Sequence, residues 1–265
     1  MTKLLLVGCG KMGGAMLEGW LAQGIPAADI VVAEPAEALR PGTPGLRSVA
    51  GTPDVREAPQ IVVLAVKPQS MDAVLPDLRR FAEGGAVFLS IAAGRTVASL
   101  ARHLGPTAKI VRAMPNTPAA VRQGITVAFA GPGVSEAEKK HCHALLEAVG
   151  QVLWVDDEAL MDPVTALSGS GPAYVFLLVE AMAAAGAKIG LAPEMAMQLA
   201  RATVAGSGEL LRRSAEPAAQ LRVNVTSPGG TTAAALQVLM AADGVQPVFD
   251  KALAAASARS KELAG

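Results

Sequence analysis

The sequence is poor in cysteine, aromatic residues and charge. Two cysteines in 265 residues exclude the disulfide framework of a small secreted domain. Aromatic residues make up 3% of the chain, too few for the stacking platforms that bind single-stranded nucleic acid. The 23 basic and 23 acidic residues cancel, so no net positive charge attracts nucleic acid or anionic membranes. We expect no nucleic-acid partner.

The sequence also lacks a long hydrophobic run and a metal-binding spacing. Its apolar stretch at 163–179 is interrupted by Ser168-Gly169-Ser170-Gly171-Pro172 and does not reach the ~20 apolar residues of a membrane span. The apolar run at 4–7 is too short for a secretion signal. His141, Cys142 and His143 are consecutive, and consecutive side chains on a helix point about 100° apart. We therefore expect no membrane partner, no metal site and a reducing, cytoplasmic setting.

What is present is a long, apolar chain. It is 51% hydrophobic but only 17% charged, whereas soluble chains are usually about 25% charged. The length suggests one large or two ordinary domains. Part of the apolar surplus is expected on a surface that a second copy covers, which predicts a homodimer or larger assembly.

Short apolar runs alternate with helical patterns through the first 155 residues. Such alternation predicts an α/β fold with a doubly wound parallel sheet, covered on both faces. A capping-box pattern, Ser135 followed by Glu138, predicts a helix that ends by Gly150. After residue 155 the patterns are only helical. The predicted strands are 3–7, 30–33, 61–66, 86–91, 109–113, 125–130 and 152–155; the other predicted helices are 11–22, 172–185, 193–213 and 231–241.

The segment Gly8-Cys9-Gly10-Lys11-Met12-Gly13 has the spacing G-x-G-x-x-G between the first strand and the first helix. In that context Gly8 permits a tight turn, Gly10 lets a pyrophosphate approach the backbone, and Gly13 lets helix and strand pack closely. The helix N-terminus offers N–H groups and a positive dipole end to the phosphates. The pattern predicts a dinucleotide site within a Rossmann-type domain.

Glu34 follows the second predicted strand, where an acidic side chain accepts hydrogen bonds from the ribose hydroxyls of NAD and repels the 2′-phosphate of NADP. No arginine follows until Arg40, so no dedicated 2′-phosphate clamp is evident. Glu34 therefore favours NADH, and NADPH stays open.

Two further strand ends should flank the ribose and nicotinamide, because ligands of doubly wound sheets cross the carboxyl ends of the strands. Their cofactor-binding candidates are Ala65, Val66, Lys67 and Pro68 after one strand, and Ala92, Ala93 and Gly94 after the next.

Three further segments complete a recognisable set: 114–118 (MPNTP), 167–174 (LSGSGPAY) and 224–232 (NVTSPGGTT). With the glycine loop and Val66-Lys67-Pro68-Gln69, they closely resemble the pyrroline-5-carboxylate reductase family from Lys3 to about Met240. The resemblance implies NADPH or NADH as cofactor, reduction of the cyclic imine of 1-pyrroline-5-carboxylate to L-proline, and an N-terminal Rossmann domain. It also implies a helical domain that interleaves with a partner's, often within larger rings such as a decamer. We divide the chain into a dinucleotide-binding domain, 1–155, and a helical substrate and dimerisation domain, 156–265.

The last segment has a chemical rationale of its own. Gly229, Gly230 and Thr231 stand just before and within the first turn of a predicted helix, where free N–H groups bind a small carboxylate. The resemblance implies that Ser227, Gly230 and Thr231 hold the substrate carboxylate. It assigns Thr232 to the ring nitrogen as hydrogen-bond partner and proton relay, and it puts Glu158 and Asn224 near the substrate. Because Pro163 follows closely, Glu158 is expected on a loop or short turn.

Other interpretations remain open at this point. A β-hydroxyacid dehydrogenase relative would use a lysine in the helical domain, where only Lys188, Lys251 and Lys261 are present. A dinucleotide sensor would need only the first domain. A reductase for another cyclic imine is a third alternative, because a carboxylate grip does not specify ring size sharply. Thr231 and Thr232 could also be simple helix caps, Glu158 a first-turn charge and Asn224 a turn residue.

Overall fold

The computed structural model describes residues 4–264, so the predicted strand residue Lys3 and the predicted domain end Gly265 lie outside the described residues. The chain divides into two compact units. The first comprises residues 4–169 together with 256–264, and the second comprises residues 170–255. The last strand ends at Val155, and the functional domain boundary at 156 stays a prediction.

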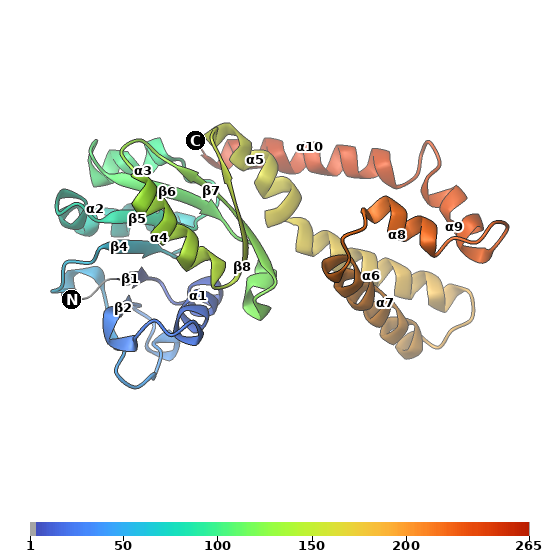
Figure 1. Cartoon of the computed structure of the whole chain (residues 1–265), viewed down its shortest axis with the longest axis horizontal. Helices are drawn as coiled ribbons and strands as arrows, with labels where there is room; N and C mark the ends of the chain where they lie inside the picture. Colours follow the sequence, from blue (N-terminus) through green and yellow to red (C-terminus); the bar gives the residue numbers. More distant parts are fainter. Residues whose placement is uncertain (1–3, 265) are drawn as a thin grey trace. The chain divides into compact units, whose positions relative to one another are not determined.

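An eight-stranded sheet with the order β3-β2-β1-β4-β5-β6-β7-β8 forms the centre of the first unit (Figure 1). Its strands are β1 (Leu4–Val7), β2 (Ile30–Ala33), β3 (Arg47–Val49), β4 (Ile61–Leu64), β5 (Val87–Ser90), β6 (Lys109–Met114), β7 (Gly124–Ala130) and β8 (Gly150–Val155). Strand β3 was not predicted; it is short and contains Arg47 and Ser48, so it lacks the apolar run that marks the others.

All neighbouring strands are parallel except β6 and β7, which are antiparallel. The prediction of a parallel sheet is therefore wrong for this pair. The connection contains only the 3-10 turn η4 (Thr117–Val121). It is shorter than the dozen or so residues that a parallel crossover needs, so the chain returns alongside the strand it left.

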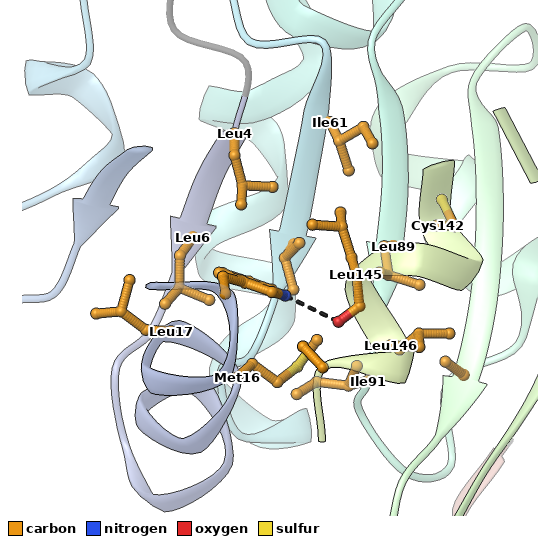
Figure 2. Packing of buried hydrophobic residues seen from close by; sticks show 14 of the residues in the cluster. Leu4, Leu6, Met16, Leu17, Ile61, Leu89, Ile91, Cys142, Leu145 and Leu146 are labelled. Carbon is orange, nitrogen blue, oxygen red and sulfur yellow. Dashed lines mark hydrogen bonds between the residues drawn. The ribbon is translucent and has the colours of Figure 1, made fainter. Parts of the chain in front are cut away.

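Helices cover both faces of the sheet, as predicted. Alternate residues of β1 enter different cores: Leu4 and Leu6 belong to one, Leu5 and Val7 to the other. The first core includes α1 and α4 and is shown in Figure 2; the second includes α2 and α3. The helices of this unit are α1 (Lys11–Ala22), α2 (Pro68–Glu83), α3 (Val97–Leu104), α4 (Glu136–Glu147) and α5 (Met161–Val164). Its short 3-10 turns, besides η4, are η1 (Ala27–Asp29), η2 (Glu37–Leu39), η3 (Thr52–Asp54) and η5 (Glu158–Leu160), and η6 (Thr165–Gly169) is π-helical.

Polar contacts define the start of α4 and tie the helix to α1. The predicted capping box is confirmed: the Ser135 hydroxyl accepts from the Glu138 N–H, and the Glu138 carboxylate accepts from the Ser135 N–H. The fully buried Trp20 of α1 donates its indole N–H to the Leu145 carbonyl at 2.8 Å, the dashed line of Figure 2. The contact satisfies both polar groups inside an apolar core, where an unpaired group would cost about 1–3 kcal/mol.

The second unit is helical in all its described elements, as predicted. Its helices are α6 (Gly171–Lys188), α7 (Pro193–Arg213), α8 (Ala218–Asn224), α9 (Thr231–Leu239) and α10 (Val245–Ala264), the last of which continues into the first unit at residue 256. Helices α6 and α7 pack side by side (Figure 1). Their contact is made of small residues: Ala183, Ala196 and Ala200 are buried, and a Cβ on Gly186 would lie 3.3 Å from the Ala196 Cβ.

Candidate active site

The glycine loop after β1 is shaped by close backbone contacts. Gly8 has a φ of +92°, and a Cβ there would lie 2.8 Å from the Ala65 carbonyl oxygen. A Cβ on Gly13 would lie 2.3 Å from the Gly8 carbonyl oxygen, so only glycine lets α1 start this close to β1. A Cβ on Gly10, by contrast, would have no described atom within 4 Å. The space beside Gly10 is open, and there a dinucleotide pyrophosphate can approach.

The first turn of α1, with Lys11 and Met12, follows this loop directly. Gly10 is its N-cap and supplies no side-chain hydrogen bond, and the described first turn contains no acidic residue. Such an end presents N–H groups and the positive end of the helix dipole to an anion. The loop and the helix start therefore fit a pyrophosphate.

Glu34, at the end of β2, is 7% exposed and is bound to this loop. Its carboxylate accepts from the Cys9 N–H at 2.7 Å and from the Ala36 N–H at 2.9 Å. Burial, with the nearby carboxylates of Glu34 and Glu18, raises the pKa of the Cys9 thiol. Glu34 thus holds the glycine loop in place, a role that sequence reasoning missed.

Arg40 lies at the same turn. Its guanidinium donates to the carbonyl of Glu34 at 2.8 Å and to the carbonyl of Pro35 at 2.9 Å. The sequence indicated no 2′-phosphate clamp, because Arg40 is six residues after Glu34. The intervening η2 turn brings the chain back, so a cation lies beside the strand end at which adenosine ribose binds in this fold.

The loops after β4 and β5 reach the same edge of the sheet, because both strands run parallel to β1. Ala65 adjoins Gly8, and Lys67 is the N-cap of α2, with Pro68 in its first turn. Gly94 has a φ of +68°, in the loop that contains Ala92 and Ala93. The predicted cofactor residues are thus gathered along one carboxyl edge, with Val66 between Ala65 and Lys67.

Glu158, predicted near the substrate, begins the short turn η5, as expected from Pro163. Its carboxylate accepts from the Val97 N–H at 2.8 Å and from the Arg112 guanidinium at 3.0 Å. Arg112 is 4% exposed, and its second terminal nitrogen lies 4.0 Å from Asp162. Glu158 is therefore the ion-pair partner of a buried arginine, and it accepts a hydrogen bond from the first N–H of α3.

The other five predicted substrate residues belong to the second unit, at the end of α8 and the start of α9. The Asn224 side-chain amide donates to Glu216 and accepts from Gln220. The loop turns through Gly229, with a φ of +70°, and is closed by a hydrogen bond from the Gly230 N–H to the Ser227 carbonyl.

Gly230 is the N-cap of α9, which puts Thr231 and Thr232 in the first turn. No side-chain capping bond and no acidic first-turn residue is present in this described helix. Neither threonine is therefore a helix cap. As in α1, the helix start follows a glycine and presents free N–H groups to an anion.

Two family models match separate parts of the chain. Residues 3–94 match the family model of NADP oxidoreductases, coenzyme F420-dependent, and residues 158–263 match the model of pyrroline-5-carboxylate reductase dimerisation. The chain is 43% identical to a pyrroline-5-carboxylate reductase of Pseudomonas aeruginosa, over 99% of this chain and 97% of that protein.

Solved structures are also similar over the full length. A pyrroline-5-carboxylate reductase of Coxiella burnetii has a TM-score of 0.91 at 35% identity, covering 100% of this chain and 99% of that one. The Plasmodium falciparum pyrroline carboxylate reductase, solved with NADP bound, has a TM-score of 0.84 at 31% identity, covering 100% of this chain and 98% of that one. These matches decide against the β-hydroxyacid dehydrogenase and sensor interpretations. The chain belongs to the pyrroline-5-carboxylate reductase family, the NAD(P)H-dependent oxidoreductases of proline biosynthesis.

Proposed function

We propose that two helix starts divide the binding of the reactants. The cofactor pyrophosphate binds at the start of α1, beside Gly8, Gly10 and Gly13, and the loops after β4 and β5 line its ribose and nicotinamide. The carboxylate of 1-pyrroline-5-carboxylate binds at the start of α9. The observation that carries the proposal is shared by both helices: each starts after a glycine N-cap without a side-chain capping bond or an acidic residue in its described first turn.

The substrate residues of this proposal have distinct tasks. Ser227, Gly230 and Thr231 hold the carboxylate, because an anion left unpaired in an apolar pocket is costly. The Thr232 hydroxyl hydrogen-bonds the ring nitrogen, and Asn224 shapes the loop from the end of α8. Glu158 contributes by position, since its carboxylate holds Arg112 and the first N–H of α3.

The reaction adds a hydride to the imine carbon and a proton to the ring nitrogen, which gives L-proline. NAD(P)H, when bound beside the glycine loop, would supply the hydride and be oxidised to NAD(P)⁺. The protein orients the two reactants, and the Thr232 hydroxyl stabilises the nitrogen as it becomes an amine and relays a proton to it. An imine is already electrophilic when protonated, so the chain needs no strong acid.

The test follows the oxidation of NADH and of NADPH with pyrroline-5-carboxylate as acceptor. We expect Thr232→Ala to lower kcat by more than roughly tenfold, the loss of a transition-state hydrogen bond of ~1.4 kcal/mol or more. Thr232→Ser keeps the hydroxyl and is the matched control. An unchanged rate in Thr232→Ala would remove this residue from the mechanism. Turnover of a six-membered cyclic imine at an equal rate would favour the broader imine reductase alternative.

We further propose that NADH is preferred over NADPH. The buried Glu34 carboxylate puts negative charge at the strand end where a 2′-phosphate would lie. Arg40 is the neighbouring cation on which use of NADPH would depend. We expect Glu34→Gln to shift the ratio of kcat/KM values toward NADPH, and Arg40→Met to shift it toward NADH. If neither substitution moves the ratio, this turn does not contact the ribose.

The match to the dimerisation model supports a homo-oligomer, and we propose a dimer as the building block of a ring such as a decamer. Large apolar side chains are exposed on the second unit, including Phe176 at 62% and Leu177 at 62%. The helical segment Glu158–Lys188 is long and apolar enough to cross a membrane, and 6% of its most apolar 18-residue window is buried. A second copy accounts for this surface, because the segment lies within the matched dimerisation region.

Both cysteines are free, which fits the proposed cytoplasmic setting.

A further inference from the structure

The loop between β5 and α3, residues 91–96, consists mainly of small residues, including the proposed cofactor residues Ala92, Ala93 and Gly94. Ile91 and Ala92 are buried at its start and Arg95 is paired with Asp72, but Ala93 and Gly94 at its centre have little or no side chain with which to pack. The hydrogen bond from the Ala92 N–H to the Ser90 hydroxyl is long, at 3.5 Å. A loop of this kind must be held by its surroundings if it is to present a fixed surface to a nicotinamide ring.

One end of the loop is held by a buried charge network. Glu158 binds the Val97 N–H, the first of α3, and the Arg112 guanidinium at 3.0 Å. Arg112 extends the network to Asp162, 4.0 Å away. Because Arg112 is 4% exposed, these contacts are poorly screened by solvent and each partner constrains the others.

The last turns of α10 join this network from the far end of the sequence. Ser260 is 5% exposed and donates its hydroxyl to the Asp162 carboxylate at 2.7 Å. In Figure 1 the end of α10 lies beside α5, which contains Asp162. One turn after Ser260, Leu263 lies against the loop itself: a Cβ on Gly94 would be 3.3 Å from both the Leu263 Cβ and its carbonyl oxygen.

The contact between Gly94 and Leu263 is made by main-chain atoms and the Leu263 Cβ, while Leu263 as a whole is 59% exposed. Burial of the leucine side chain therefore does not explain why this turn lies here. The bond between Ser260 and Asp162 ties the turn to α5. An oxygen donor bound to a carboxylate forms one of the stronger hydrogen bonds in proteins, and here the donor is buried.

We propose that the C-terminal turns of α10, residues 256–264, are a positioning element for the cofactor. Ser260 anchors them to Asp162, and Leu263 then supports Gly94 and fixes the β5–α3 loop in its cofactor-binding shape. Ser260 is a positioning residue, because it acts through Asp162 and the loop. This inference rests on the proposed assignment of Ala92, Ala93 and Gly94 to the cofactor.

The test is hydrogen–deuterium exchange of the full-length protein without cofactor, followed by steady-state kinetics. In Ser260→Ala we expect the amides of residues 91–97 to exchange about tenfold faster, while those of residues 8–14 stay unchanged. The KM for NAD(P)H should rise roughly three- to tenfold, with kcat within about twofold, because a hydrogen bond to a charged group is lost. Ser257→Ala, half-buried and one turn earlier, is the matched control and should match the wild type.

The outcomes separate this inference from the proposed function. Unchanged exchange at residues 91–97 in Ser260→Ala would overturn the anchor, whichever residues bind the cofactor. Faster exchange with an unchanged KM would overturn it by removing the loop from the cofactor site. Ser260→Cys, similar in volume but a weak donor, replaces the alanine variant if that variant does not fold. An equal effect of Ser257→Ala would make the change a general loss of stability.

Discussion

Gly10 and Gly13 are three residues apart, and alanine should affect a different property at each: stability at Gly13 and cofactor affinity at Gly10. At Gly13 the new Cβ would lie 2.3 Å from the Gly8 carbonyl oxygen and 3.1 Å from the Ala65 Cβ. The carbonyl belongs to the backbone and cannot rotate away, so β1 and α1 must separate. Overpacking of this severity costs about 3 kcal/mol. Alanine is about 1 kcal/mol more favourable than glycine within a helix, which offsets part of this cost. We therefore expect Gly13→Ala to lower the free energy of unfolding by about 2 kcal/mol.

At Gly10 the backbone has φ −69° and ψ −164°, which any residue adopts, and a Cβ would have no described atom within 4 Å. We therefore expect Gly10→Ala to change the stability by less than about 1 kcal/mol. Its methyl group would occupy the space through which the pyrophosphate reaches the start of α1. Cofactor affinity should fall tenfold or more, which corresponds to about 1.4 kcal/mol or more.

The assay uses the two tryptophans, Trp20 and Trp154, which both belong to the first unit. Denaturant unfolding followed by tryptophan fluorescence therefore reports on that unit, even if the two units unfold separately. Calorimetric titration with NADH and with NADPH measures the affinity of each variant. Wild-type stability in Gly13→Ala, or wild-type affinity in Gly10→Ala, would contradict the roles derived for these glycines.

Four further predictions rest on contacts and exposure. Glu158→Gln should lower the free energy of unfolding by about 1–3 kcal/mol, because the buried Arg112 loses its counter-charge but keeps an acceptor. The substrate KM should change less than about threefold. A KM rise beyond tenfold at full stability would make Glu158 a direct ligand. Burial raises the pKa of the Cys142 thiol from 9.0 to about 12. The folded state thus retains a proton that the unfolded state loses, so this contribution to stability is complete below pH 9 and declines from about pH 9 to 12. At pH 8 alkylation of Cys9 and Cys142 should require unfolding, and rapid labelling of the native protein would contradict their burial. In sedimentation at micromolar concentration we expect a dimer or larger, and a stable monomer would refute the explanation given for the exposed apolar residues.

The glycine loop was predictable because its chemistry is local. Gly8, Gly10 and Gly13 lie within six consecutive residues, and the strand before them and the helix after them each have a clear pattern. The carboxyl edge was predictable for a related reason, since parallel strands bring the residues that follow them to the same side. The α9 loop was recognised only through its resemblance to a family, and its glycine N-cap then supplied a physical basis.

Other elements carried no such signal. Strand β3 and helices α2, α3, α5, α8 and α10 were given no predicted range: β3 has polar residues, and α5 and α8 are short. The antiparallel pairing of β6 and β7 was missed because the apolar pattern of a strand does not show its direction relative to its neighbour. Its direction is set by the length of the connection.

The sequence by itself determined the α/β and helical division, the dinucleotide loop and the family. Only the tertiary structure decided which distant polar groups meet. Glu34 binds the glycine loop 25 residues away, Glu158 faces Arg112 across 46 residues, and Ser260 reaches Asp162 across 98. Hydrophobic periodicity reports which face of an element is buried. The pairing of two distant polar groups depends on how whole elements pack, and no local pattern records it.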